Sequence, residues 1–195
     1  MKNMIRSFLP ILAVILSAGS VSAQTPEFPP LDKSPLDIAY FPSRAAFRFF
    51  AKSDEDQKAD EPAIKVIYSR PQKKGRDIFG ALEAYGSIWR AGANENTEIR
   101  FFKDAKIGDS EVPAGTYSMF IIPDEDKWTL IINKDLDAWG AYSYLEDNDL
   151  LRYEAVTEKS SKTIEEFSIM FEASEEGAVM IIGWDKTFVR IPISL

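Results

Sequence analysis

The sequence predicts an all-β fold: a single domain with little helix, built as an antiparallel β-sandwich of jelly-roll-like type. The first observation is a series of strand-length runs rich in β-branched and aromatic residues and separated by turn residues. These runs are 64–69, 97–102, 116–122, 128–133, 151–157, 163–171, 178–184 and 188–193. The second observation is that no window of about 12 residues beyond residue 23 shows a helical period.

The C-terminal runs carry the clearest strand pattern. Large apolar residues occupy alternate positions through 167–172 and 189–194, as they do in half-buried antiparallel strands. Glu175-Glu176-Gly177 and Asp185-Lys186 separate neighbouring runs at hairpin length and therefore predict two tight turns. Pro192 predicts that the last run is an edge strand, because proline donates no ladder hydrogen bond.

The residues before the first predicted strand have a different composition. Residues 24–44 contain several prolines and predict an extended lead-in. An apolar aromatic run, 45–50, follows, so we place the β-sandwich domain at 45–195. The charged run 53–61 predicts an exposed loop.

The N-terminus has the pattern of a secretory signal peptide. Lys2 and Arg6 precede the apolar run 8–16, and Val21-Ser22-Ala23 is a small-residue cleavage pattern. We therefore expect residues 1–23 to be cleaved and the protein to be exported to the periplasm or the medium. The chain has no cysteine to acylate, so we do not expect a lipoprotein. No later run of about 20 apolar residues predicts a membrane span.

The composition excludes several kinds of chemistry. The chain has 31 acidic and 23 basic residues and a net charge of −8, so we do not expect nucleic acid as a partner. It contains neither His nor Cys, which removes the commonest general base, the commonest metal ligand and a thiolate nucleophile. A Ser-His-Asp triad is therefore impossible. No disulfide can form, so the fold must rest on its hydrophobic core.

Four cations lie close together in this acidic chain: Arg70, Lys73, Lys74 and Arg76. A guanidinium can clamp a carboxylate, phosphate or sulfate through two parallel hydrogen bonds. The cluster therefore predicts an anion-binding loop with Arg70, Lys74 and Arg76 as ligand-binding residues. The alternative is a solvated hairpin tip whose charges neutralise nearby acidic residues.

A second candidate lies in the segment 89–97, which reads WRAGANENT. Trp89 offers a flat apolar face, while Arg90 and Asn94 offer hydrogen bonds to the polar edge of a sugar-like ligand. Trp139, in a later aromatic loop, is a second candidate wall. The alternative is structural, because Asn and Gly form turns and a Trp beside a strand is commonly part of the core.

No cofactor is predicted, although a loose calcium site is left open as a weaker alternative. Asn133, Asp135 and Asp137 alternate like the start of a calcium loop, with Asp147 and Asp149 nearby. The glycine and the bidentate Glu of an EF-hand are missing from their places.

Several short motifs, taken together, resemble the secreted bacterial family DUF2911. They are Tyr68-Ser69-Arg70-Pro71, Lys74-Gly75-Arg76, Phe79-Gly80, Tyr85-Gly86, residues 89–95 and Ala114-Gly115-Thr116-Tyr117. Asn96, where many members carry Ala, is a small departure. The resemblance implies an exported single domain and supports residues 68–97 as its signature. The family has no established activity, so the resemblance implies no catalytic residue.

Three functions follow as hypotheses. The first is an exported binding module for a small anionic or polyhydroxylated, glycan-like ligand. The second is a glycan or envelope hydrolase that uses two carboxylates, for which Glu83, Glu95, Glu98 and Asp149 are nominal candidates. The third is a structural or assembly partner in the cell envelope, whose sign would be a broad exposed apolar patch. The sequence indicates no oligomeric state.

Overall fold

The structure is a computed structural model that describes residues 25–195. The expected signal peptide lies outside the described residues. The chain divides into two units, Met1–Pro30 and Leu31–Leu195. The described part of the first unit, 25–30, has no regular secondary structure, and every helix and strand that the structure describes lies in the second unit. Within residues 25–195, no helix is long and apolar enough to cross a membrane.

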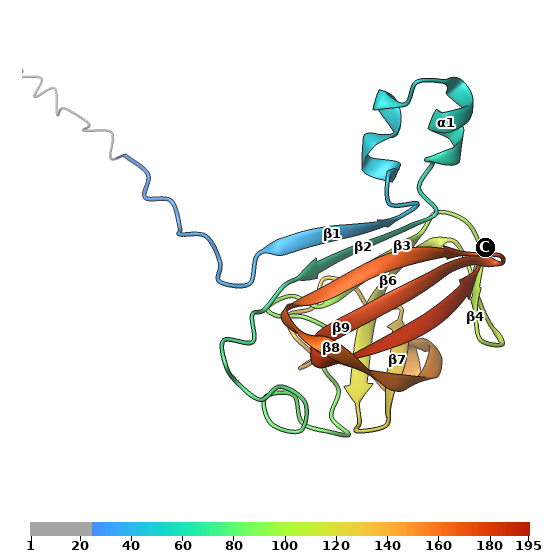
Figure 1. Cartoon of the computed structure of the whole chain (residues 1–195). Helices are drawn as coiled ribbons and strands as arrows, with labels where there is room; N and C mark the ends of the chain where they lie inside the picture. The colour runs from blue at the N-terminus through green and yellow to red at the C-terminus, as the bar shows by residue number, and fades with distance from the viewer. Residues whose placement is uncertain (1–24) are drawn as a thin grey trace, which may run out of the picture. The chain divides into compact units, whose positions relative to one another are not determined.

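The second unit is built on one antiparallel sheet of nine strands, in the order β1-β2-β3-β6-β7-β8-β9-β4-β5. Figure 1 labels all of these strands except β5. The strands are β1 (Leu36–Phe41), β2 (Ile64–Ser69), β3 (Thr97–Phe101), β4 (Ala105–Ile107), β5 (Ser110–Val112), β6 (Gly115–Pro123), β7 (Lys127–Asn133), β8 (Asp149–Ser174) and β9 (Gly177–Ser194). Three short helices complete it: 3-10 helices η1 (Ala45–Phe50) and η2 (Glu146–Asn148), and α1 (Asp54–Ala59). The prediction of a mostly β, antiparallel fold with little helix is confirmed.

The four C-terminal runs predicted as separate strands form only two strands. Strand β8 contains both 151–157 and 163–171, and β9 contains both 178–184 and 188–193. The predicted turn at Asp185-Lys186 is therefore wrong. The β8–β9 register shifts here, and Asp185 has a φ of 58°, so the irregularity bends the pair without ending β9. The chain does turn at Glu175-Glu176, as predicted.

The edge position predicted from Pro192 is also wrong, because β9 lies between β8 and β4. Pairing of β9 with β8 runs as far as Val189, and its pairing with β4 starts at Ile193. Pro192 falls between these two ladders. A residue without an N–H is tolerated there because neither ladder requires its donor.

The charged run 53–61 was expected to be an exposed loop, but most of it forms α1. The hydroxyl of Ser53 caps the helix by accepting a hydrogen bond from the N–H of Asp56 at 3.1 Å. Acidic residues fill the first turn, where the helix dipole favours negative charge. No residue of α1 is buried, so the prediction of an exposed segment agrees with the structure while the prediction of a loop does not.

A single apolar core includes residues from nearly every strand. Side chains alternate between the two faces of a strand, so one face of each long strand contributes to this core. Examples are Ile64, Ile99, Ile121, Leu130, Ile169 and Ile182, each less than 5% exposed. At its centre is a cluster of aromatic rings from Phe79, Trp89, Trp128, Phe167 and Trp184. One of these rings, Trp184, also lines a pocket.

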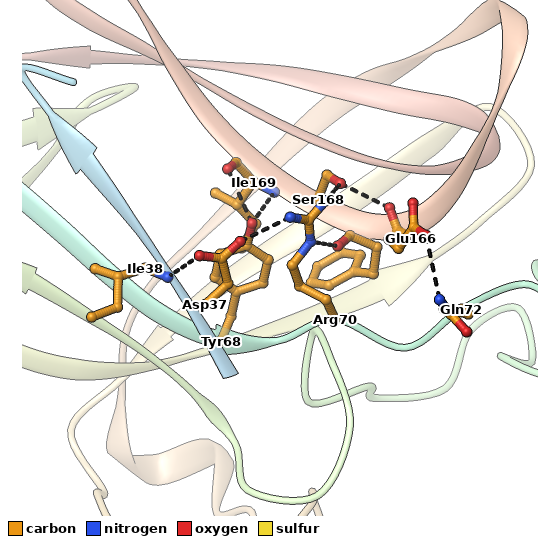
Figure 2. Close-up of polar contacts among 9 residues, drawn as sticks. Asp37, Ile38, Tyr68, Arg70, Gln72, Glu166, Ser168 and Ile169 are labelled. Carbon is orange, nitrogen blue, oxygen red and sulfur yellow. Dashed lines mark hydrogen bonds and ion pairs between the residues drawn. The ribbon is translucent and has the colours of Figure 1, made fainter. Parts of the chain in front are cut away.

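A side chain of β2 bonds to the backbone of β8, with which β2 forms no regular ladder (Figure 2). The buried Tyr68 hydroxyl accepts a hydrogen bond from the N–H of Ile169 at 3.1 Å and donates one to the carbonyl of the same residue at 3.3 Å. One hydroxyl therefore satisfies both backbone groups.

We expect Tyr68→Phe to lower the free energy of unfolding by about 1–3 kcal/mol, because it leaves the buried N–H and C=O of Ile169 without partners. Tyr40→Phe is the matched control, because Tyr40 lies on the neighbouring strand β1 and its hydroxyl has no hydrogen-bond partner within residues 25–195. Urea unfolding of both variants measures the difference. Equal stability of the two variants would show that the Tyr68 hydroxyl is not needed.

Candidate functional site

A pocket of about 480 Å³ opens between the long loop that joins β2 to β3 and the segment before β1. Its charged lining consists of Lys33, Lys74, Arg76, Glu83 and Arg90. Gln72 adds a polar group, and the buried Trp184 from the aromatic cluster adds an apolar one. Residues that are widely separated in sequence therefore line one pocket.

The start of the loop is held against β8. The N–H of Lys73 donates to the carbonyl of Glu165 at 2.8 Å, and the N–H of Phe167 donates to the carbonyl of Pro71 at 3.0 Å. Lys74 and Gly75 then turn the chain with φ values of 48° and 72°. This turn brings the side chains of Lys74 and Arg76 to the pocket.

The end of the loop is held against β6. The backbone of Trp89 exchanges two hydrogen bonds with that of Ile121, at 2.8 and 2.9 Å. The indole of Trp89 donates to the carbonyl of Gly92 at 3.0 Å. A Cβ at Gly92 would lie 3.1 Å from the carbonyl oxygen of Ser69, so the close approach favours glycine. Arg90 is thus presented from a fixed backbone.

Three of the pocket cations have no acidic partner. Within residues 25–195, the side chains of Lys33, Lys74 and Arg90 form neither an ion pair nor a hydrogen bond. Six of the 21 cations in residues 25–195 form ion pairs, as Lys73 does with Asp185 at 2.9 Å, so the grouping of these three at one pocket distinguishes them more than their lack of a partner. In a protein with 31 acidic residues, unpaired cations along one pocket leave a local positive field that favours an anion.

Arg90 is the most informative of these residues. Its Nε is buried and has no hydrogen-bond partner. A buried donor without an acceptor is uncommon in native proteins, and bonding of Arg90 to a ligand therefore has to use its Nη groups rather than this atom. Its guanidinium therefore lies at the pocket with its donors unused.

Arg76 divides its donors between the loop and the pocket. Its Nε donates to the carbonyl of Lys73 at 2.9 Å, and one Nη donates to the carbonyl of Gln72. These bonds fix the side chain, and the remaining N–H groups are free to bind a ligand.

Glu83 is the single carboxylate in the described lining of the pocket. Burial raises the pKa of Glu83 from 4.5 to about 7, against the opposing effect of the positive charges on Arg90 and Arg76. Neutral Glu83 can donate a hydrogen bond to an anion, and ionised Glu83 can accept one from a hydroxyl. The charge of the pocket therefore changes near neutral pH.

A family model described as "Protein of unknown function (DUF2911)" matches residues 51–193. The chain belongs to the DUF2911 family. The resemblance drawn from the short motifs is thereby confirmed. No curated protein and no solved structure matches the chain. The DUF2911 match includes Lys74, Arg76, Glu83 and Arg90, whereas Lys33 precedes it.

Of the residues predicted to bind ligand in this DUF2911 protein, the structure brings Lys74, Arg76 and Arg90 together. Arg70 lies elsewhere and joins β1 to β8 (Figure 2). It donates to the carboxylate of Asp37 at 2.8 Å, to the carbonyl of Phe167 at 3.2 Å and to the hydroxyl of Ser168 at 2.8 Å. Its donors are therefore used for structure.

Trp89, Asn94 and Trp139 do not line the pocket either. Trp89 is 2% exposed and belongs to the core. Asn94 adopts a positive φ of 61°, and its carbonyl accepts from the N–H of Gly140 at 2.9 Å, so it is a turn residue. Trp139 is 61% exposed in a separate loop.

The carboxylates considered for hydrolysis or calcium binding have other surroundings. Of Glu83, Glu95, Glu98 and Asp149, only Glu83 lines the pocket. Asp149 accepts hydrogen bonds from Asn133, Tyr144 and Arg152, at 2.8, 2.6 and 2.8 Å. The described residues contain no group of three or more acidic side chains placed to hold a metal ion.

Lys33 and Trp184 are among the pocket residues that the sequence did not predict. Lys33 lies in the proline-rich lead-in, far in sequence from the basic loop, and only the fold places it at the pocket. Trp184 lies in β9 as an ordinary core residue of an alternating strand. The sequence carried no local signal for either role.

Proposed function

We propose that the protein is an exported binding module for a small anionic ligand that also carries hydroxyl groups, such as a sugar acid. The observation that carries this proposal is the set of three cations, Lys33, Lys74 and Arg90, that line one pocket without an acidic partner. The volume of about 480 Å³ suits a monosaccharide-sized ligand, because ligand pockets commonly measure about 300–1,000 Å³.

The chemistry of the lining supports a ligand with both kinds of group. The guanidinium of Arg90 suits a planar carboxylate, and Lys33 and Lys74 add point charges. Gln72 and Glu83 offer donors and acceptors to hydroxyl groups. Trp184 adds an apolar contact at the buried side of the pocket.

The proposal has two further parts, export of the protein and a sandwich-like packing of the sheet. Export is supported by the charged and apolar N-terminal segment with its small-residue cleavage pattern. A sandwich-like, jelly-roll-like packing of the sheet is supported by β8, which pairs with β7 up to Val156 and with β9 from Thr157 onward. A strand that changes partners in this way can join two packed layers.

The test compares two ligands that differ at one group. Glucuronate carries a carboxylate where glucose carries a hydroxymethyl, so a thermal denaturation series with both isolates the charge. We expect glucuronate to raise the melting temperature and glucose to leave it unchanged. A ligand at 100 times its dissociation constant stabilises the folded state by about 2.7 kcal/mol. Phosphate and sulfate test other anions, and the absence of a shift with every anion would contradict the proposal.

Affinity for glucuronate should rise several-fold as the pH falls from about 8 to about 6. Burial raises the pKa of Glu83 to about 7, so this carboxyl is negative above that value and neutral below it, while glucuronate keeps its charge throughout. Loss of the negative charge removes repulsion between Glu83 and the ligand. Isothermal titration calorimetry across this range measures the effect.

Glu83→Gln is the control, since its amide stays neutral at every pH. Its affinity should be nearly independent of pH and match that of the unmodified protein at low pH.

The same carboxyl affects folding, because the pKa of Glu83 is higher in the folded state than in the unfolded one. Its contribution to stability is fully present below pH 4.5 and is lost as the pH rises through about 7. For binding, an affinity for glucuronate that falls as the pH is lowered would contradict the role assigned to Glu83.

A further inference from the structure

A second feature of the molecule is an apolar surface at the β1 edge of the sheet. We propose that this surface, formed by η1 and the groove beside it, binds a second copy of the chain in a symmetric dimer. The inference is independent of the anion pocket.

The geometry of η1 directs its phenylalanines outward. In a 3-10 helix, residues three apart lie above one another, so 45–50 form three columns. The first, Ala45 and Arg48, faces inward, since Ala45 is fully buried and Arg48 donates to its carbonyl at 3.0 Å. The other two columns end in Phe49 and Phe50, which are 71% and 82% exposed.

The first residues of the two outward-facing columns of η1 line a groove. Ala46 and Phe47, which start these two columns, line an apolar groove of about 680 Å³ between β1 and β8. Its other apolar lining includes Ile38 and Met170, which are 48% and 50% exposed on the outer faces of these strands. The protruding rings and the groove therefore form one continuous surface.

A symmetric dimer requires a patch that complements itself. This patch holds both parts, a protruding pair of rings and a neighbouring groove, so two copies related by a two-fold axis can each insert Phe49 and Phe50 into the partner. Another exposed aromatic group, Trp139 and Tyr142, lines neither this groove nor the anion pocket.

The exposed apolar area suits a weak, reversible dimer. A phenylalanine buries about 150–250 Å², so Phe47, Phe49 and Phe50 at 61%, 71% and 82% exposure present roughly 300–500 Å². Ile38 and Met170 extend the patch, which stays below the about 800 Å² per partner of a standard interface, so the dimer should be weak and depend on concentration. The patch is within the about 300–600 Å² of the largest apolar patch on an ordinary monomer, and such a patch is often functional.

We do not expect this dimer to form through backbone hydrogen bonds between β1 of one copy and β1 of the other. The outward N–H of Ile38 is already taken by the carboxylate of Asp37 at 2.8 Å, and Asp37 is in turn held by Arg70 (Figure 2). Side-chain contacts therefore have to supply the association. This favours the rings of η1 over the edge of β1.

Sedimentation velocity of the purified protein over a concentration series tests the proposal. We expect reversible formation of a species of twice the monomer mass. The double variant Phe49→Ser with Phe50→Ser should stay monomeric, and Met170→Glu, which places a charge in the groove from a distant part of the sequence, should do the same. All three side chains are at least half exposed, so the fold should survive, and thermal denaturation checks it.

Tyr142→Ser is the matched control, because Tyr142 is 88% exposed and lies outside the patch; it should dimerise normally. A protein that remains monomeric at every concentration overturns the proposal. Dimerisation that survives either patch variant, or that fails in Tyr142→Ser, also overturns it. Flotation of a monomeric protein with phosphatidylethanolamine–phosphatidylglycerol vesicles, lost in the double variant, would identify a lipid surface instead.

Discussion

Replacing Arg90 by Gln is expected to weaken glucuronate binding about 10-fold to 100-fold. A hydrogen bond to a charged group contributes about 1.5–3 kcal/mol, and the guanidinium of Arg90 has no other acceptor within the described chain. The substitution removes the charge and the forked donor together. Isothermal titration calorimetry at pH 6 measures the loss with Glu83 largely neutral.

Two variants separate the role of Arg90 from general effects of charge. Arg90→Lys keeps the positive charge but loses the forked donor, so it should bind with intermediate affinity. Arg100→Gln removes an exposed cation that lies outside the pocket and should bind as the unmodified protein does. Equal affinities for Arg90→Gln and Arg100→Gln would show that the pocket is not the binding site.

The sequence predicted part of this site because cations close together in an acidic chain are a local signal. Lys74, Arg76 and Arg90 were found in this way and do share the pocket. Arg70 belongs to the same sequence cluster, but its side chain bonds to β8 instead. Sequence proximity alone could not show which cations line the pocket and which one bonds to β8.

The remaining features of the site depend on the fold. Glu83 was named only as one of several carboxylates, because its burial, and hence its raised pKa, results from packing. Asn96, a small departure from the family pattern, is buried and accepts a hydrogen bond from the N–H of Ala138 at 3.0 Å. It therefore has a structural role that no local pattern indicated.

Six of the nine strands were predicted, because β-branched and aromatic runs with alternating burial are a direct consequence of strand geometry. The short strands β4 and β5 were missed, and β1 lies in the segment predicted as an extended lead-in. The turns between the strands were not well predicted. Asp185-Lys186 has the composition of a turn, yet β9 continues through it, since pairing with β8 outweighs local turn preference. Turn residues inside a long irregular ladder cannot be distinguished from a hairpin by composition.

Phe167→Ala should be the most destabilising of these substitutions, lowering the free energy of unfolding by about 3–5 kcal/mol. Phe167 is fully buried, and its ring lies 5.7 Å from that of Tyr68, 4.9 Å from that of Trp89 and 6.1 Å from that of Trp184. Truncation leaves a cavity among these rings that rigid neighbours cannot fill. Urea denaturation with an unchanged m-value measures the loss.

Val156→Ala is the control on the same strand, because Val156 is 76% exposed and its truncation removes little packing. A loss for Phe167→Ala no larger than the loss for this control would contradict the central place given to the aromatic cluster. Phe167 also connects the core to the pocket, since Trp184 lines the pocket and stacks on Trp89 at 5.9 Å. Phe167→Ala should therefore reduce both stability and glucuronate affinity, whereas Arg90→Gln should reduce affinity alone. This difference separates a residue that supports the pocket from one that contacts the ligand.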